Sequence, residues 1–197
     1  MKMREDFCAH SMPAKPHIIL QYQESGLIQY ISDSMKYKAY TLRLGKYPQS
    51  AITDIYVSHA IPEEAMMMPE DGVKCRGKWD TGCNMTCISR RIAEALKLVP
   101  ERLMEVKTPH GASEYYNTYN IAIKIPNGHI YHNVEVCEAR MVDADMLIGM
   151  DIITMGDFAL SHNQYGEVIL SICTPPLMSI DLAPLADEVN KDNLTAD

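Results

Sequence analysis

Residues 78–89, KWDTGCNMTCIS, place one carboxylate, Asp80, in an Asp-Thr-Gly tripeptide close to two cysteines, Cys83 and Cys87. A carboxylate can act as a general acid or base, especially where a second carboxylate shares its proton. Asp, Thr and Gly are also common turn residues, so the tripeptide alone is weak evidence for catalysis. A metal site formed by Cys75, Cys83 and Cys87 is a third interpretation, although their spacings of eight and four residues differ from the paired Cys-x-x-Cys of zinc sites.

Asp80 lies between a predicted strand and a predicted helix. The strand is VKCRGKW (73–79), and the segment after the tripeptide leads into a helix expected over SRRIAEALKLVP (89–100). Further along, two apolar residues and Gly149 directly precede a short helical segment, MDIITMG (150–156). In this context of strand, turn and helix, the tripeptide is stronger evidence for catalysis than it is alone.

Most of the remaining middle of the chain has the pattern of β-strands. β-branched and aromatic residues alternate with polar ones, and turn residues such as Asn127-Gly128 separate the runs. Fourteen Met against two Phe and one Trp favour an adaptable, aliphatic core. The sequence therefore predicts a mostly-β domain with one definite helix. The expected strands are YKAYTLRL (37–44), AITDIYVS (51–58), YNIAIKIP (119–126), HIYHNVEV (129–136), DFALSH (157–162) and EVILSI (167–172).

The composition of the 197-residue chain limits its class. A net charge of -8 argues against nucleic acid as a partner, because phosphate binding needs clustered Lys and Arg. No run approaches the length of a membrane span, and the N-terminal residues lack the apolar core of a secretory signal. We therefore expect a cytoplasmic protein with reduced cysteines. The expected organisation is an N-terminal extension (1–35), one domain (36–175) and an acidic C-terminal tail (176–197).

The residues around Asp80 resemble those of retropepsin-like, retroviral-type aspartic proteases, and more closely their bacterial relatives. That family shows an apolar residue, Asp-Thr-Gly, a small residue, two variable positions, Thr or Ser, and Ile-Ser before a helix. A second family motif, two apolar residues and Gly before a final helix, is matched by LIGMD (147–151). The resemblance covers about residues 36–175. The residues that match the first motif are Trp79, Asp80, Thr81, Gly82, Cys83, Thr86, Ile88 and Ser89.

The resemblance implies an all-β, retropepsin-like closed barrel with one main short helix. It also implies a homodimer that hydrolyses peptide bonds, because the sequence has one Asp-Thr-Gly and a pair of carboxylates is needed. Metal and organic cofactors are not implied. The partners would be a second copy of the chain and a peptide or protein substrate.

The resemblance assigns roles to particular residues. A hairpin flap would lie in VKTPHGASEYY (106–116), although an exposed turn is the alternative role of His110. Cys83 stands where the family most often has Ala, so a thiol beside the carboxylate could make activity redox-sensitive. The residues assigned are Asp80, Thr81 and Gly82 for catalysis; Cys83, Asn84, His110 and Gly111 for substrate binding; and Thr86, Leu147, Ile148 and Gly149 for support of the active loop.

Other interpretations stay open at this point. The same fold could be a non-catalytic, peptide-binding dimer, because a fold does not guarantee activity. Asp143 and Asp145 fit a solvated turn better than a second acid pair. Asp151 fits a helix-start or loop-bracing carboxylate better than a catalyst.

Overall fold

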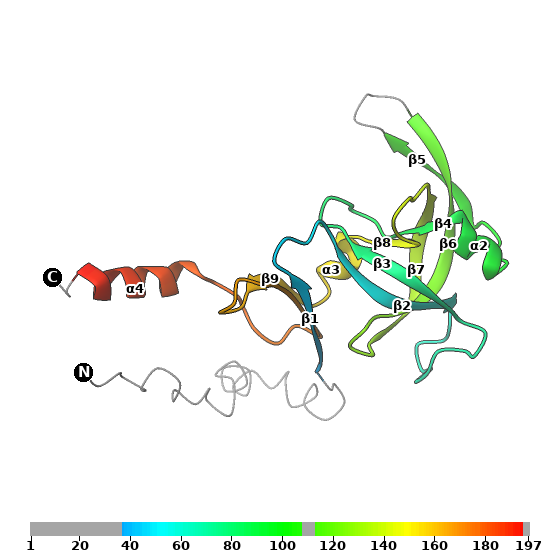
Figure 1. The fold of residues 1–197 in the computed structure, drawn as a ribbon. Helices are drawn as coiled ribbons and strands as arrows, with labels where there is room; N and C mark the ends of the chain where they lie inside the picture. Colours follow the sequence, from blue (N-terminus) through cyan, green and yellow to red (C-terminus); the bar gives the residue numbers. More distant parts are fainter. Residues whose placement is uncertain (1–36, 108–112, 195–197) are drawn as a thin grey trace, which may run out of the picture. The chain divides into compact units, whose positions relative to one another are not determined.

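Six strands close into a barrel in the computed structural model, which describes residues 37–107 and 113–194 (Figure 1). The hydrogen-bonded order is β2-β3-β8-β4-β7-β6, and β6 pairs back onto β2. The first half of β6 instead pairs with β5, which adds a seventh strand to the sheet. The expected mostly-β, closed-barrel architecture is confirmed. The strands are β2 (Ala51–His59), β3 (Val73–Trp79), β4 (Cys87–Ser89), β5 (Arg102–Lys107), β6 (Ser113–Lys124), β7 (Ile130–Ala139) and β8 (Met146–Ile148).

A second, three-stranded antiparallel sheet has the order β1-β10-β9. Its strands are β1 (Lys38–Gly45), β9 (Asp157–His162) and β10 (Val168–Thr174). The central strand β10 is buried at Leu170 and Ile172 and, at its end, at Cys173 and Thr174, and none of its residues is exposed. Both sheets belong to one unit, residues 37–177.

The strand boundaries follow the alternation of the sequence closely. The predicted hairpin around Asn127-Gly128 is present, and Gly128 adopts a left-handed φ of 82°, which glycine tolerates without a steric penalty. The turn is closed by a hydrogen bond from Gly128 N to Ile125 O at 2.9 Å. Ile121, Ile123 and Ile125 are each 3% exposed or less, so the predicted apolar face of this hairpin does face the core.

The core is built mainly from isoleucine, as the expected aliphatic core requires, and methionine contributes little to it in the described residues. Met146 is the one methionine among the buried apolar residues described, whereas Met66 and Met67 are largely exposed. β-branched residues suit strands that are buried on one face, which explains why isoleucine dominates a barrel.

Three helices are described. The predicted helix is present as α2 (Arg90–Ala95), with Ser89 at its N-cap position. It ends five residues before the predicted Pro100, because Lys97 adopts a left-handed φ of 52° and Leu98 N bonds back to Ala93 O. The expected short helix after Gly149 is α3 (Met150–Ile153). A third helix, α4 (Ala183–Leu194), lies in the acidic tail and was not predicted; it belongs to a separate unit from the barrel.

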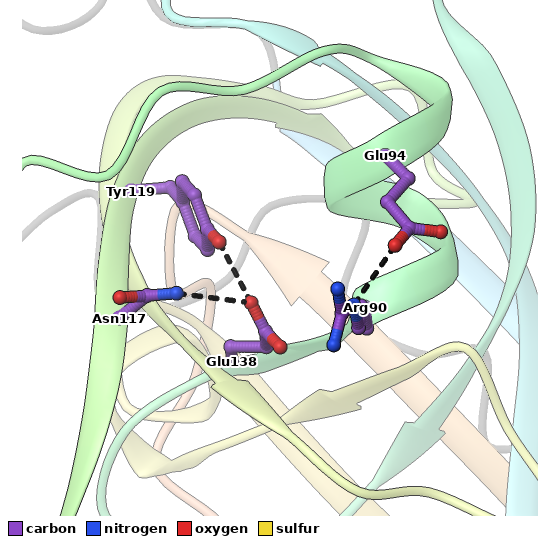
Figure 2. A network of polar contacts seen from close by, with 5 residues as sticks. All are labelled: Arg90, Glu94, Asn117, Tyr119 and Glu138. Atoms are coloured by element: carbon purple, nitrogen blue, oxygen red, sulfur yellow. Dashed lines mark hydrogen bonds and ion pairs between the residues drawn. The ribbon is translucent and has the colours of Figure 1, made fainter.

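A group of polar side chains lies where α2 meets β6 and β7 (Figure 2). Tyr119 donates a hydrogen bond to Glu138 at 2.7 Å, and Arg90 forms an ion pair with Glu94 at 2.8 Å along the helix. Burial and the bond to Glu138 raise the pKa of the Tyr119 phenol. These contacts satisfy the polar tip of a buried tyrosine, so we assign them a structural role.

Among the helices of the described residues, none is both long and apolar enough to cross a membrane.

Candidate active site

Asp80 directly follows β3 and is positioned by the parallel strand β8, which comes much later in the sequence. β3 pairs with β8 so that Trp79 lies opposite Ile148, and Asp80 N donates to Ile148 O at 3.0 Å. The two segments that the sequence singled out, the Asp-Thr-Gly tripeptide and the Leu-Ile-Gly motif, therefore emerge side by side at one end of the barrel. Their meeting places the Asp80 carboxylate at the end of a rigid sheet.

The tripeptide forms a tight turn around its own carboxylate. Gly82 N donates to Asp80 Oδ1 at 2.9 Å, and Cys83 N donates to Asp80 O at 3.1 Å. Asp80 is half-buried, while Thr81 and Gly82 are exposed. The turn uses one carboxylate oxygen, and no described residue hydrogen-bonds to Oδ2. Asp80 therefore does stabilise a turn, and this leaves its second carboxylate oxygen available for chemistry.

A buried network behind the turn fixes the rest of the loop. Thr86 is fully buried, and it donates to Asp151 twice, from N at 2.8 Å and from Oγ1 at 2.7 Å. The Thr86 hydroxyl also accepts a hydrogen bond from Gly149 N at 3.1 Å. A third hydrogen bond to Asp151 comes from Ile152 N at 2.9 Å. The loop-bracing interpretation of Asp151 is thus confirmed, and Thr86 is the residue through which it reaches Gly149.

The start of α3 packs directly against the loop backbone. Met150 N donates to Cys83 O at 2.8 Å, and Asp151 N donates to Asn84 O at 3.3 Å. A Cβ on Gly149 would lie 2.7 Å from the carbonyl carbon of Met85 and 2.8 Å from Cys83 O. Since real Cβ atoms do not come this close to backbone, this position requires glycine.

An open groove of about 550 Å³ begins at Asp80 and Thr81. Trp79 forms part of its wall; its indole N–H donates to Thr53 Oγ1 at 2.9 Å, and its ring packs against Phe158 with centroids 5.5 Å apart. Aromatic and aliphatic side chains contribute much of the lining, and two lysines add positive charge. The full lining comprises Leu44, Lys46, Tyr47, Pro48, Gln49, Ser50, Ala51, Lys78, Trp79, Asp80, Thr81, Phe158, Leu160 and Val168.

The cysteines near Asp80 do not form the metal site that the sequence left open. Cys83 and Cys87 are neighbours, but the third sulfur of the group belongs to Cys137, and Cys75 is buried in β3. Within residues 37–107 and 113–194, no group of three or more His, Cys, Asp or Glu side chains is arranged to hold a metal ion. The described cysteines are free thiols.

The structure brings most of the residues singled out in the sequence into one loop and its support. Asp80, Thr81, Gly82, Cys83 and Asn84 form the loop, with Asn84 exposed. Support comes from Thr86 and Gly149, as described above, and from Leu147 and Ile148 in β8, of which Ile148 is buried. His110 and Gly111 lie outside the described residues, and so does the tip of the expected flap.

Two structural features could not be recognised in the sequence. The 46–50 segment and Phe158 line the groove, although neither has a motif that indicates it. Asp145 was interpreted as part of a solvated turn. It accepts a hydrogen bond from Arg76 N at 3.0 Å and forms an ion pair with Arg91 at 2.7 Å. Burial alone would raise the pKa of Asp145, but the Arg76 N–H and the Arg91 guanidinium outweigh burial and lower it.

Residues 71–155 match the sequence model of a family described as gag-polyprotein putative aspartyl protease. The matched segment contains both Asp80-Thr81-Gly82 and the Leu-Ile-Gly motif that ends at Gly149. Comparison with curated proteins gives no match.

Solved structures similar to this chain are retroviral and bacterial proteases. A retropepsin-like aspartic protease from Rickettsia conorii is 13% identical, with a TM-score of 0.46, and the alignment covers 71% of this chain and 97% of that one. The EIAV protease in complex with an inhibitor is 14% identical, with a TM-score of 0.38, over 54% of this chain and 86% of that one. The Simian Foamy Virus (mac) protease is 20% identical, with a TM-score of 0.35, over 52% and 92%. The family match confirms that residues 71–155 are similar in sequence to aspartic proteases of the retroviral type.

Proposed function

We propose that the protein is a homodimeric aspartic endopeptidase that hydrolyses peptide bonds through Asp80 and the Asp80 of a second copy. The observation that carries this proposal is the half-exposed Asp80 carboxylate at the mouth of a groove, held by a loop that is braced from β8 and α3. The aspartyl protease family match over residues 71–155 supports the same reaction class. The second copy is needed because the sequence contains one Asp-Thr-Gly and the chemistry requires two carboxylates.

In the proposed reaction, two carboxylates close to the symmetry axis share one proton, since both cannot be ionised at such short range. The ionised member removes a proton from a water molecule, and the water attacks the peptide carbonyl carbon. The protonated member donates to the carbonyl oxygen and, at collapse of the tetrahedral intermediate, a proton passes to the leaving amine. Neither a metal ion nor an organic cofactor takes part.

The neighbours of Asp80 have supporting roles in this proposal. Thr81, which is exposed, would hydrogen-bond across the two-fold axis and stiffen the pair. Gly82, also exposed, would let the substrate backbone approach the carboxylates. Cys83 and Asn84 would contact substrate from the loop, and His110-Gly111 would close over it from the flap.

The test is peptide cleavage by the wild type and by Asp80→Asn, with Asp143→Asn as the matched control. Asp143 is an exposed carboxylate in the described part of the chain, so its neutralisation removes the same charge away from the site. We expect Asp80→Asn to reduce kcat/KM by about a thousandfold or more, and Asp143→Asn to leave it unchanged. Equal cleavage by wild type and Asp80→Asn, or no cleavage by either over a broad peptide library, would contradict the proposal. Peptide binding without turnover would instead support the non-catalytic alternative.

A subunit-mixing experiment tests the dimer separately. Excess Asp80→Asn protein should lower wild-type activity as mixed dimers form, because a mixed dimer has one ionisable carboxylate in place of two. Sedimentation at the same concentrations measures association directly. An active strict monomer would refute the shared site.

A further inference from the structure

Three cysteine sulfurs form a short row behind the loop that carries Asp80. Cys83 Sγ and Cys87 Sγ are 3.9 Å apart, and Cys87 Sγ and Cys137 Sγ are 3.0 Å apart. Cys83 belongs to the loop, while Cys87 and Cys137 are register partners on the parallel strands β4 and β7. Two neighbouring thiols of one stretch, Cys83 and Cys87, thus meet a third, Cys137, which lies 50 residues after Cys87 in the sequence.

The row has an accessible end and a buried end. Cys83 is half-buried, whereas Cys87 is 6% and Cys137 is 7% exposed. Cys83 is therefore the most accessible of the three residues to a small oxidant. The inner pair, in contrast, is the closer pair: a disulfide bond of about 2.05 Å requires Cys87 and Cys137 to approach by about 1 Å, and Cys83 and Cys87 by about twice that distance.

The two thiols of the inner pair, Cys87 and Cys137, differ in pKa. The hydrogen bond between the Cys87 and Cys137 sulfurs lowers the pKa of Cys137 against the opposing effect of burial. The same bond, together with burial, raises the pKa of Cys87. Cys137 is therefore the thiol of the pair that ionises first, and the thiolate is the form that attacks sulfur.

We propose that Cys83, Cys87 and Cys137 form a redox relay in which a hydroperoxide oxidises Cys83 and the final product is a Cys87–Cys137 disulfide. In the first step the Cys83 thiol and the hydroperoxide ROOH give a sulfenic acid, Cys83–SOH, and ROH. Cys87 then attacks the Cys83 sulfur; its proton passes to the Cys137 thiolate and from there to the displaced hydroxide, which leaves as water and restores the Cys137 thiolate. This forms the Cys83–Cys87 disulfide.

The last step is a thiol–disulfide exchange within the row. The Cys137 thiolate attacks the Cys87 sulfur, the Cys83–Cys87 bond breaks, and Cys83 leaves as a thiolate, which takes up the proton that Cys137 lost on ionising. The net reaction converts two thiols and one hydroperoxide into one disulfide, one alcohol and one water. The hydroperoxide is the oxidant, and Cys83 is regenerated, so it acts as a relay for the buried pair.

The relay is connected to the loop through backbone hydrogen bonds. Cys83 N donates to Asp80 O, and Cys83 O accepts from Met150 N. A Cys83–Cys87 disulfide would pull on both contacts, while the final Cys87–Cys137 disulfide would release Cys83 and join β4 to β7 beneath it. The formation of the disulfide does not depend on peptidase activity, so it is tested without an activity assay.

The experiment treats the reduced, folded full chain with hydrogen peroxide, blocks the remaining thiols with N-ethylmaleimide, and maps the disulfides by mass spectrometry. Trypsin leaves Cys83 and Cys87 on one peptide (79–90) and Cys137 on another (125–140). We expect these two peptides to be linked, with fragmentation placing the maleimide on Cys83. Cys137→Ser should stop the relay at a Cys83–Cys87 disulfide within the first peptide.

Two further variants separate the relay from direct oxidation of the buried pair. Cys83→Ser should slow formation of the Cys87–Cys137 disulfide about tenfold or more, with Cys83→Ala as a second replacement. Cys75→Ser, at a buried cysteine in β3, is the matched control and should not change the rate. Thermal unfolding of each reduced variant verifies that it is folded. An unchanged rate in folded Cys83→Ser and Cys83→Ala, or over-oxidation of Cys83 with no link between the two peptides, would overturn the proposal.

Discussion

Replacing Asp151 with Asn tests whether the hydrogen-bond donors behind the active loop require a carboxylate at this position. Asp151 accepts three hydrogen bonds, from Thr86 N, Thr86 Oγ1 and Ile152 N. Oδ2 receives Thr86 N, and Oδ1 receives the other two. Asn has one oxygen and one NH₂ group, so one of these two positions becomes a donor.

Both orientations of the amide introduced at position 151 leave a donor facing a donor. If its oxygen takes the place of Oδ2, the NH₂ group faces the N–H of Ile152; if its oxygen takes the place of Oδ1, the NH₂ group faces the N–H of Thr86. Ile152 N keeps a second hydrogen bond, to Gly149 O at 3.2 Å, but in either orientation the introduced NH₂ group faces a donor in place of an acceptor, and an unmade hydrogen bond at such a site costs about 1–3 kcal/mol. We therefore expect Asp151→Asn to lower the free energy of unfolding by about 1–3 kcal/mol, even though the side chain keeps its size.

The measurement is urea unfolding of wild type, Asp151→Asn and Asp143→Asn at one protomer concentration, because dimer formation would make stability concentration-dependent. Asp143 is exposed in the same part of the sequence, and its substitution should change stability by less than about 0.5 kcal/mol. Thr86→Val supplies a second arm. It removes the hydroxyl that accepts from Gly149 N and should cost a similar amount.

The double variant Asp151→Asn/Thr86→Val gives the sharpest outcome. Both changes damage one network, so we expect their combined cost to differ from the sum of the single costs by more than about 0.5 kcal/mol. Single variants as stable as Asp143→Asn, or costs that add within error, would refute the claim that Asp151 braces the loop through Thr86.

Two further predictions concern the packing and electrostatics around the same loop. Gly77→Ala places a Cβ 2.4 Å from Ile55 Cγ1, so we expect a loss of about 1–3 kcal/mol in the free energy of unfolding, measured by urea titration. Asp145 has a folded-state pKa below its unfolded value, because the Arg76 N–H and Arg91 outweigh burial. Its stabilising contribution is therefore present above about pH 4 and is lost as the pH falls through the lower, folded-state value. Asp145→Asn should reduce the stability difference between neutral pH and pH 3; an unchanged difference would contradict this assignment.

Strands with clear alternation could be predicted from the sequence almost to the residue. The segments 73–79 and 157–162 coincide with β3 and β9. Alternation works for β3 because Cys75, Gly77 and Trp79 are buried on one face, and a shift by one residue would expose that face. The turn at Asn127-Gly128 was equally readable, since few residues other than glycine adopt its positive φ without strain.

The short strands β4 and β8 could not be predicted in this way. Each has three residues, too few for a period of two to stand out from chance. Their pairing with β7 and β3 is parallel and joins distant parts of the chain, so no local turn signals it. The row of cysteines depends on this pairing, and therefore the spacing in the sequence suggested Cys75 as the third member instead of Cys137.

The same pairing explains why the two family motifs must occur together. Gly149 lies 69 positions after Asp80 in the sequence, yet its neighbour Ile148 holds the backbone of Asp80, and Gly149 N is held by Thr86. A side chain on Gly149 would push against the loop that carries the carboxylate. Asp-Thr-Gly supplies a carboxylate in a turn that many proteins could form, whereas the Leu-Ile-Gly strand and Asp151 fix where that turn lies. The position of Asp80 is therefore a property of both motifs, and the loss of either should move the carboxylate from its place at the groove.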